Sequence, residues 1–235
     1  MRNRLMKMTA WLVVSLFLAF SPAMAKEKYE EKFAKTMALA KDGKVDISNV
    51  SGDIWVTSWN EDQVKIEALK VSQASSFEKA KENAAKVTIE VVAEGNLLRI
   101  ETKYPKSEKF WGGESVNVSV DYKLWIPEKA ALKATNVSGD IIGEALGGPA
   151  SLKSVSGDVN VAKAAGGAEC NSVSGDITVG DVVGSAFLKS VSGDVKASSI
   201  QGSVEAESVS GDIELLDVSE APTARVKALS GEVLF

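Results

Sequence analysis

The residues of this sequence whose spacing could support chemistry are carboxylates that recur at a fixed interval. Val-Ser-Gly-Asp occurs at residues 137–140, 155–158, 173–176, 191–194 and 209–212, each copy 18 residues after the last. The glycine and the acid of the five copies are Gly139 and Asp140, Gly157 and Asp158, Gly175 and Asp176, Gly193 and Asp194, and Gly211 and Asp212. If successive repeats stack as strands, the carboxylates form a line spaced by roughly 4.8 Å.

Such a line of like charges needs a compensating interaction, because carboxylates about 5 Å apart repel by roughly 1 kcal/mol even in water. In one hypothesis each aspartate accepts hydrogen bonds from turn amides, as in Asx turns. In the other, calcium bridges the carboxylates, as in nonapeptide β-rolls built on Gly-Gly-x-Gly-x-Asp. The sequence lacks the extra glycines of that motif, which favours the first hypothesis. We therefore predict a structural turn ladder without a bound metal.

Catalysis by these residues is disfavoured. A pair of carboxylates can hydrolyse glycosides, but such a site is not repetitive, whereas every aspartate here has the same neighbours. The sequence contains no histidine, which removes the commonest general base and metal ligand. A serine row therefore has no histidine partner, and stacked hydroxyl hydrogen bonds explain it better; its members are Ser154, Ser172, Ser190 and Ser208. We predict no catalytic residue and no cofactor, so the protein is not an enzyme.

The elements that position the ladder follow from a second period, a glycine at every ninth residue from Gly139 to Gly211. Glycine at such a spacing marks turns that need positive φ or a close backbone approach. Between the turns apolar and polar residues alternate, as in Val159-Asn160-Val161, which is typical of strands. The sequence predicts an all-β fold, a single-stranded β-solenoid with 18-residue coils and two faces. A solenoid of helices is excluded because glycine at this spacing breaks helices.

Apolar residues at equivalent positions form rows that we expect to line a thin core. The rows are Val137, Val155, Val173, Val191 and Val209; Ile141, Val159, Ile177, Val195 and Ile213; Leu146, Ala164, Val182, Ile200 and Val218; and Ala150, Ala168, Ala186 and Val204. Cys170, the only cysteine, lies in a further row with Leu152 and Leu188, which indicates a small buried residue and not a reactive thiol. The register falters after Gly211, where two extra residues near Pro222 delay the next copy.

Residues 26–135 lack the period but contain runs typical of strands at 45–50, 54–58, 64–69, 87–92, 97–102 and 116–126. A helix is expected near residues 76–86, opened by a capping box from Ser75 to Glu78. Gly95-Asn96 and Gly112-Gly113 indicate hairpin turns. An early Val-Ser-Gly-Asp at 50–53 suggests that this part is continuous with the repeats of 136–235, so we predict one domain with an inserted helix.

The aromatic residues of the mature chain gather in the non-repetitive part. The residues that carry the interpretation are Trp55, Trp59, Tyr104, Phe110, Trp111, Tyr122 and Trp125. The favoured interpretation is that these large side chains close the open end of the solenoid. The alternative is an exposed sugar-binding platform, for which Trp59, Phe110 and Trp111 are the candidate contacts because polar residues or glycines flank them.

The N-terminus has the pattern of a secretory signal peptide. A basic start precedes an apolar run at 9–20, and Ala23-Met24-Ala25 supplies a cleavage site. The alternative, an uncleaved anchor, is disfavoured because twelve apolar residues are too few to span a bilayer. Cleavage would leave 24 basic against 32 acidic side chains, a net charge of −8. That charge disfavours nucleic acid as a partner, and we expect an exported protein with no transmembrane segment in its mature chain.

The order of these features resembles the bacterial putative-adhesin family of exported β-strand-repeat proteins. The resemblance is carried by the strand Lys44-Val-Asp-Ile-Ser-Asn-Val-Ser-Gly-Asp-Ile54, the inserted helix, Leu124-Trp-Ile-Pro-Glu128 and the tandem Ser-Gly-Asp repeats, over about 35–235. It implies a right-handed β-helix without catalytic residues. One departure is the apolar strand at Phe235, where no polar cap is evident. We therefore expect a structural or interaction protein of the periplasm or cell surface, whose partner is an envelope protein or a surface glycan.

Overall fold

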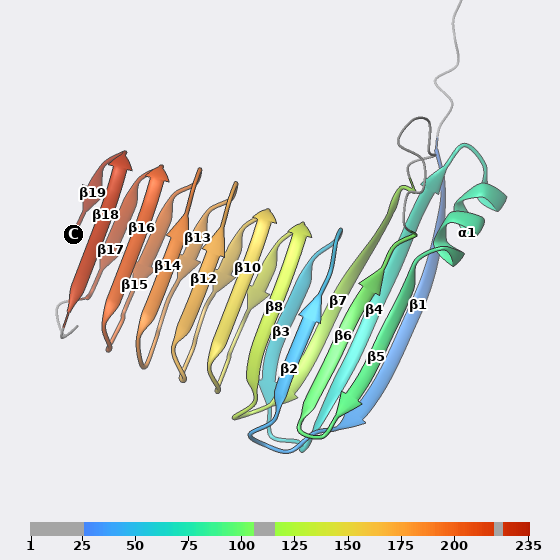
Figure 1. The fold of residues 1–235 in the computed structure, drawn as a ribbon, viewed down its shortest axis with the longest axis horizontal. Coiled ribbons are helices and arrows are strands. Elements are labelled where there is room, and N and C mark those ends of the chain that lie inside the picture. Colours follow the sequence, from blue (N-terminus) through green and yellow to red (C-terminus); the bar gives the residue numbers. More distant parts are fainter. Residues whose placement is uncertain (1–25, 106–115, 219–222) are drawn as a thin grey trace, which may run out of the picture.

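The computed structural model describes residues 26–105, 116–218 and 223–235. In this part of the chain, nineteen strands form two sheets that face each other along an elongated solenoid, called the rack below, with one helix at one end (Figure 1). The ten-stranded sheet contains, in spatial order, β1 (Glu27–Ala38), β4 (Gln63–Ala74), β7 (Val118–Pro127), β3 (Ile54–Trp59), β9 (Ile141–Gly143), β11 (Val159–Val161), β13 (Ile177–Val179), β15 (Val195–Ser198), β17 (Ile213–Leu216) and β19 (Val233–Leu234). The nine-stranded sheet contains β18 (Ala224–Ser230), β16 (Val204–Ser210), β14 (Ala186–Ser190), β12 (Ala168–Ser172), β10 (Ala150–Ser156), β8 (Ala131–Ser138), β2 (Lys44–Ser48), β6 (Leu97–Lys103) and β5 (Thr88–Glu94). The predicted β-rich fold with one short helix is confirmed.

From β8 onward the chain visits the two sheets alternately, one strand in each per turn of the rack. Neighbouring strands of a sheet are parallel, and Val159 pairs with Ile141 on one side and Ile177 on the other. The partners share residue type because the sequence period equals the distance along the chain between them. Side chains facing inward from the two sheets make one continuous core, in which Val159, Ile177 and Cys170 are fully buried.

One predicted core row is wrong. The valines of the Val-Ser-Gly-Asp copies lie on the outside, with exposed fractions from 38% at Val191 to 46% at Val173. Their orientation follows from strand alternation: Leu152 and Ser154 of β10 face inward and are buried, so Val155 must face outward. The other three rows of the repeats are buried, apart from the half-buried Val218.

Each coil also has a short third side that the two-faced prediction missed. Isolated parallel bridges join Leu146 to Ala164, Ala164 to Val182 and Val182 to Ile200. These four side chains are buried, because the corner that carries them turns the chain from the ten-stranded sheet back toward the nine-stranded one. The coil is therefore a flattened triangle with two long sides and one short side.

The N-terminal part extends both sheets and covers their end. The strands β2 and β3 form a coil between β8 and β9 on one side and β6 and β7 on the other. Beyond it the pairing becomes antiparallel, β4 with β7, β1 with β4 and β5 with β6. The sequence did not predict β1, which is mostly exposed yet pairs with β4 along its whole length. The Gly95-Asn96 turn joins β5 to β6 as expected, whereas Gly112-Gly113 lies outside the described residues.

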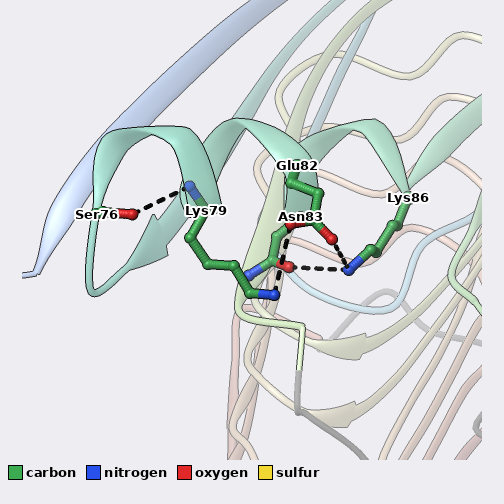
Figure 2. Close-up of polar contacts among 5 residues, drawn as sticks. All are labelled: Ser76, Lys79, Glu82, Asn83 and Lys86. Carbon is green, nitrogen blue, oxygen red and sulfur yellow. Dashed lines mark hydrogen bonds and ion pairs between the residues drawn. The ribbon is translucent and has the colours of Figure 1, made fainter.

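The helix α1 (Phe77–Ala85) packs on β4 and β1 and confirms the predicted helix. Its N-cap is Ser76 and not Ser75, because the Ser76 hydroxyl accepts the backbone N–H of Lys79 (Figure 2). Glu82 forms ion pairs with Lys79 at 3.5 Å and Lys86 at 2.8 Å, and Lys86 also donates to Asn83 (Figure 2). These contacts fix the exposed side of a helix whose Ala80 and Ala84 are fully buried.

Candidate functional site

The aspartates of the repeats form one continuous hydrogen-bonded line, the aspartate ladder, along the edge where the chain passes from the nine-stranded to the ten-stranded sheet. The backbone N–H of Asp158 donates to Oδ1 of Asp140 at 2.8 Å, and the N–H of Asp176 donates to Oδ1 of Asp158 at 2.9 Å. The same bond recurs from Asp194 to Asp176 and from Asp212 to Asp194. Each carboxylate thus accepts an amide of the next coil, so the predicted turn-amide acceptor is present but the bond joins coils instead of closing an Asx turn.

The ladder extends beyond the tandem copies at both ends. The N–H of Asp140 donates to Asp53 at 2.9 Å, and the N–H of Asp53 donates to Asp121 at 3.0 Å. At the other end the N–H of Glu232 donates to Asp212 at 2.8 Å. The sequence indicates two of these members, Asp53 through the motif at 50–53 and Glu232 through the variant Leu-Ser-Gly-Glu at 229–232. Asp121 has no motif, and only the pairing of β7 with β3 brings it into line.

The glycine before each aspartate is required by close approach. A Cβ on Gly157, Gly175, Gly193 or Gly211 would lie 2.1 to 2.2 Å from the carbonyl oxygen of the equivalent glycine one coil earlier. Of the two reasons considered from the sequence, positive φ applies to Gly139 but to none of these four. Their missing side chain is what lets successive turns stack at strand spacing.

The serine row supports the same turns, though not through stacked hydroxyls as predicted. Ser172 Oγ donates to the carbonyl of Gly157 at 3.2 Å, and Ser190 Oγ donates to that of Gly175 at 3.1 Å. Asn136 takes this role toward Gly52, with Nδ2 donating at 2.8 Å. The buried serines and this asparagine therefore each satisfy a turn carbonyl of the preceding coil.

No group of three or more histidine, cysteine, aspartate or glutamate side chains placed to hold a metal ion occurs in the described ranges. The one thiol, Cys170, is fully buried, and burial raises its pKa to about 12. It stays protonated at neutral pH and is not available as a nucleophile.

The described aromatic residues divide between the core and the outer surface, and Trp55 and Trp125 face outward from the sheet instead of closing the end of the solenoid. Tyr122 is buried and its hydroxyl lies 2.6 Å from that of Thr102; burial raises its pKa to about 12. Trp55 and Trp125 lie on the outer face of the ten-stranded sheet, edge to face with ring centres 5.7 Å apart. Lysine ammonium groups lie over both rings, because Lys65 and Lys123 occupy the adjoining positions of the neighbouring strands.

Of the three candidate sugar contacts, only Trp59 is described. Its indole is half-buried and Nε1 donates to the backbone carbonyl of Gln63 at 2.7 Å. Phe110 and Trp111 lie outside the described residues.

The outer face of the nine-stranded sheet carries charges of both signs in cross-strand pairs. Lys153 contacts Glu169 at 3.0 Å, and Lys189 contacts Glu207 at 2.9 Å. The hydrogen bond and charge of the lysine lower the pKa of each glutamate. Phe187 lies among these pairs with 51% of its surface exposed and borders a surface hollow on either side.

The outward valines make a second surface feature, the valine ridge. Its members, in spatial order, are Val50, Val137, Val155, Val173, Val191, Val209 and Leu229. The backbone beneath it is fixed by hydrogen bonds between coils, for example from Ser174 N–H to the Val155 carbonyl at 2.9 Å. The ridge follows the edge to which the arrowheads of β8, β10 and β16 point in Figure 1.

Residues 36–234 match the family described as Toastrack DUF4097. The chain belongs to this family. No curated protein matches the chain, and no described helix of this family member is long and apolar enough to cross a membrane.

Solved structures similar to this Toastrack chain include three bacterial proteins. A putative adhesin from Bacteroides fragilis is 14% identical, with a TM-score of 0.48 over 87% of this chain and 96% of its own. A putative cell adhesion protein from Clostridium sporogenes is 12% identical, with a TM-score of 0.39 over 88% and 98%. A putative lipid binding protein from Parabacteroides distasonis is 15% identical, with a TM-score of 0.40 over 87% and 96%. The chain is assigned to its family by the match of residues 36–234 and not by these structures.

Proposed function

We propose that this Toastrack chain is an exported, non-catalytic protein of the cell envelope that binds an envelope protein or a surface glycan through its long outer β faces. The observation that carries the proposal is the outer face of the nine-stranded sheet, where the exposed Phe187 lies among charged pairs on a rigid parallel scaffold. An exposed aromatic side chain surrounded by polar groups is typical of binding surfaces.

In this proposal the repeats have a structural role. Residues 1–25 are a cleaved signal peptide. Residues 26–235 form one domain, a right-handed β-helix with 18-residue coils in the repeats. The aspartate ladder and its glycines hold the coils together without a metal ion. Inter-coil hydrogen bonds to Asp158, Asp176 and Asp194 support this role, since each uses a carboxylate oxygen.

Two experiments test the proposal. The first is fractionation of the native host with intact-mass measurement, where the expected result is an extracytoplasmic chain starting at Lys26. Retention of residues 1–25 would contradict export.

The second is co-sedimentation of labelled residues 26–235 with isolated envelopes, competed by unlabelled protein. Phe187→Ser should weaken saturable binding at least tenfold, whereas Leu216→Ser on the ten-stranded sheet, where the leucine is 50% exposed, should not. Protease treatment of the envelopes that abolishes binding would assign a protein partner, and glycosidase treatment that abolishes it would assign a glycan. Equal binding by the two variants would reject this face.

A further inference from the structure

The valine ridge is a pre-formed apolar line with no cover in the described structure. Its five repeat valines, between Val137 and Val209, are 38% to 46% exposed, and the inter-coil hydrogen bonds beneath them fix their spacing at that of a parallel sheet. A contiguous apolar surface of this kind, bordered by polar residues, marks an interaction site.

The two flanks of the ridge differ in charge, because one row contains three lysines, each within 4.0 Å of a glutamate of its own chain, and the other row is acidic throughout. Going around a coil, the outward residue two positions before each valine belongs to a row that includes Lys153, Lys189 and Lys227. Three positions after each valine comes the aspartate ladder. The ridge therefore separates a row that contains lysines from a row that is entirely acidic.

We propose that the ridge is the contact between two copies of this chain, related by a two-fold axis parallel to the long axis of the rack. This inference is independent of the envelope partner proposed above. A second copy presents apolar side chains with the same period, so the ridges fit each other coil by coil. The direction of the axis follows from charge, because this rotation places the acidic flank of each copy opposite the lysine flank of the other.

The arrangement makes specific pairs. Since such an axis keeps each coil level with its equivalent, Lys153 faces Asp158 of the partner subunit, and Lys189 faces Asp194 of the partner subunit. Each pair occurs twice by symmetry. At the fifth copy Glu207 faces Asp212 of the partner subunit, but Lys189 and Lys227 lie 2.9 and 4.0 Å from Glu207 in its own chain. A two-fold axis perpendicular to the long axis of the rack would instead place the two aspartate ladders opposite each other, and their like charges would repel.

The affinity of this contact is set by its narrow shape. A stable interface buries roughly 800 Å² per partner, and a single row of half-exposed valines supplies less. We therefore expect a weak, reversible dimer, weakened further by salt because the flanking pairs are solvent-exposed.

Cysteine cross-linking of residues 26–235 tests the geometry. In the proposed dimer every ridge residue faces its own equivalent, so Val137→Cys, Val173→Cys and Val209→Cys should each form a disulfide-linked dimer with itself under mild oxidation. The controls are Thr178→Cys, exposed on the ten-stranded sheet, and the unsubstituted chain with its buried Cys170, and neither should form a disulfide-linked dimer. The absence of any cross-link at the ridge would overturn the proposal. An antiparallel pattern would also overturn it, in which Val173→Cys alone cross-links to itself and Val137→Cys cross-links only to Val209→Cys.

Sedimentation velocity tests the energetics with a matched pair of charge reversals. Lys189 and Lys196 have the same 57% side-chain exposure, and each pairs with a glutamate of the next coil, but only Lys189 flanks the ridge. Lys189→Glu and Val173→Asp should each raise the dissociation constant at least tenfold, and Lys196→Glu should leave it unchanged. A monomer at all concentrations up to about 200 µM, or equal effects of the two lysine variants, would show that the ridge is not this interface.

Discussion

The close stacking of the turn glycines gives the sharpest test of the fold, through Gly175→Ala. The new Cβ would lie 2.2 Å from the carbonyl oxygen of Gly157 and 2.6 Å from its carbonyl carbon. Both atoms belong to backbone in a parallel ladder, so no side-chain rotation relieves the clash. The two coils must part by about 1 Å at this corner to restore ordinary contact distances.

The cost follows from the hydrogen bonds at the same corner. The bond from Asp176 N–H to Asp158 is 2.9 Å long, that from Ser172 Oγ to the Gly157 carbonyl is 3.2 Å, and that from Ser174 N–H to the Val155 carbonyl is 2.9 Å. Lengthening each by about 1 Å takes it beyond hydrogen-bonding distance. Three bonds at roughly 1 kcal/mol each give a loss of about 3 kcal/mol, a large part of the stability of an ordinary domain.

Chemical denaturation followed by circular dichroism measures this loss, and hydrogen exchange at the Asp176 and Asp194 amides locates it. Two other glycines serve as controls. Gly180→Ala meets its first backbone atom only at 3.2 Å, so it should change stability by less than about 1 kcal/mol. Gly95→Ala has open space but a φ of +60°, so its cost should be about 1 kcal/mol from backbone strain alone. If Gly175→Ala were as stable as Gly180→Ala, the close-approach explanation of the repeat would be wrong.

The remaining predictions concern the ladder and the buried ionisable groups. Asp176→Ala removes the acceptor of the Asp194 amide and should cost about 1 to 2 kcal/mol in denaturation experiments, whereas Asp176→Asn keeps an acceptor and should be neutral or mildly stabilising. A chelator should leave the melting temperature of the unsubstituted chain unchanged, and a clear fall would indicate a metal-bound ladder. Burial raises the pKa of Cys170 to about 12, so its contribution to stability is complete below the pKa of an unfolded thiol, near 8.5, and is lost as the pH rises toward 12. Cys170→Ala should flatten the fall in unfolding free energy over that range by up to about 4 kcal/mol, and an unchanged slope would show that the thiol is not responsible.

The sequence predicted the repeats well because their period and their strand alternation agree. Gly-Asp at a fixed interval and rows such as Ile141, Val159 and Ile177 are local signals that the parallel pairing preserves. It predicted the aspartate ladder as a line of acceptors, but not that each donor comes from the next coil. That distinction depends on which amide lies above the carboxylate, and composition does not encode it.

The elements that the sequence missed are those whose conformation depends on tertiary pairing. In β1 the apolar residues Tyr29, Phe33 and Met37 recur every fourth position, a spacing more typical of a helix than of a strand. The segment is a strand because β4 offers an edge of matching length, and Glu31 reaches the buried Lys70 across it at 3.2 Å. Pairing of this kind overrides local propensity.

In each repeat the serine is buried and the valine is exposed, which also follows from tertiary pairing. This arrangement connects the hydrogen bonds of the turns to the shape of the outer surface. A buried hydroxyl is tolerated only if it has a partner, and Ser172 and Ser190 each find one in the glycine carbonyl of the preceding coil. That carbonyl is accessible because the next coil has a glycine there, since any Cβ would lie about 2 Å from it. Glycine, serine and aspartate therefore satisfy one corner together, and strand alternation then forces the intervening valine outward. The exposed ridge is thus a consequence of how the turns are hydrogen-bonded.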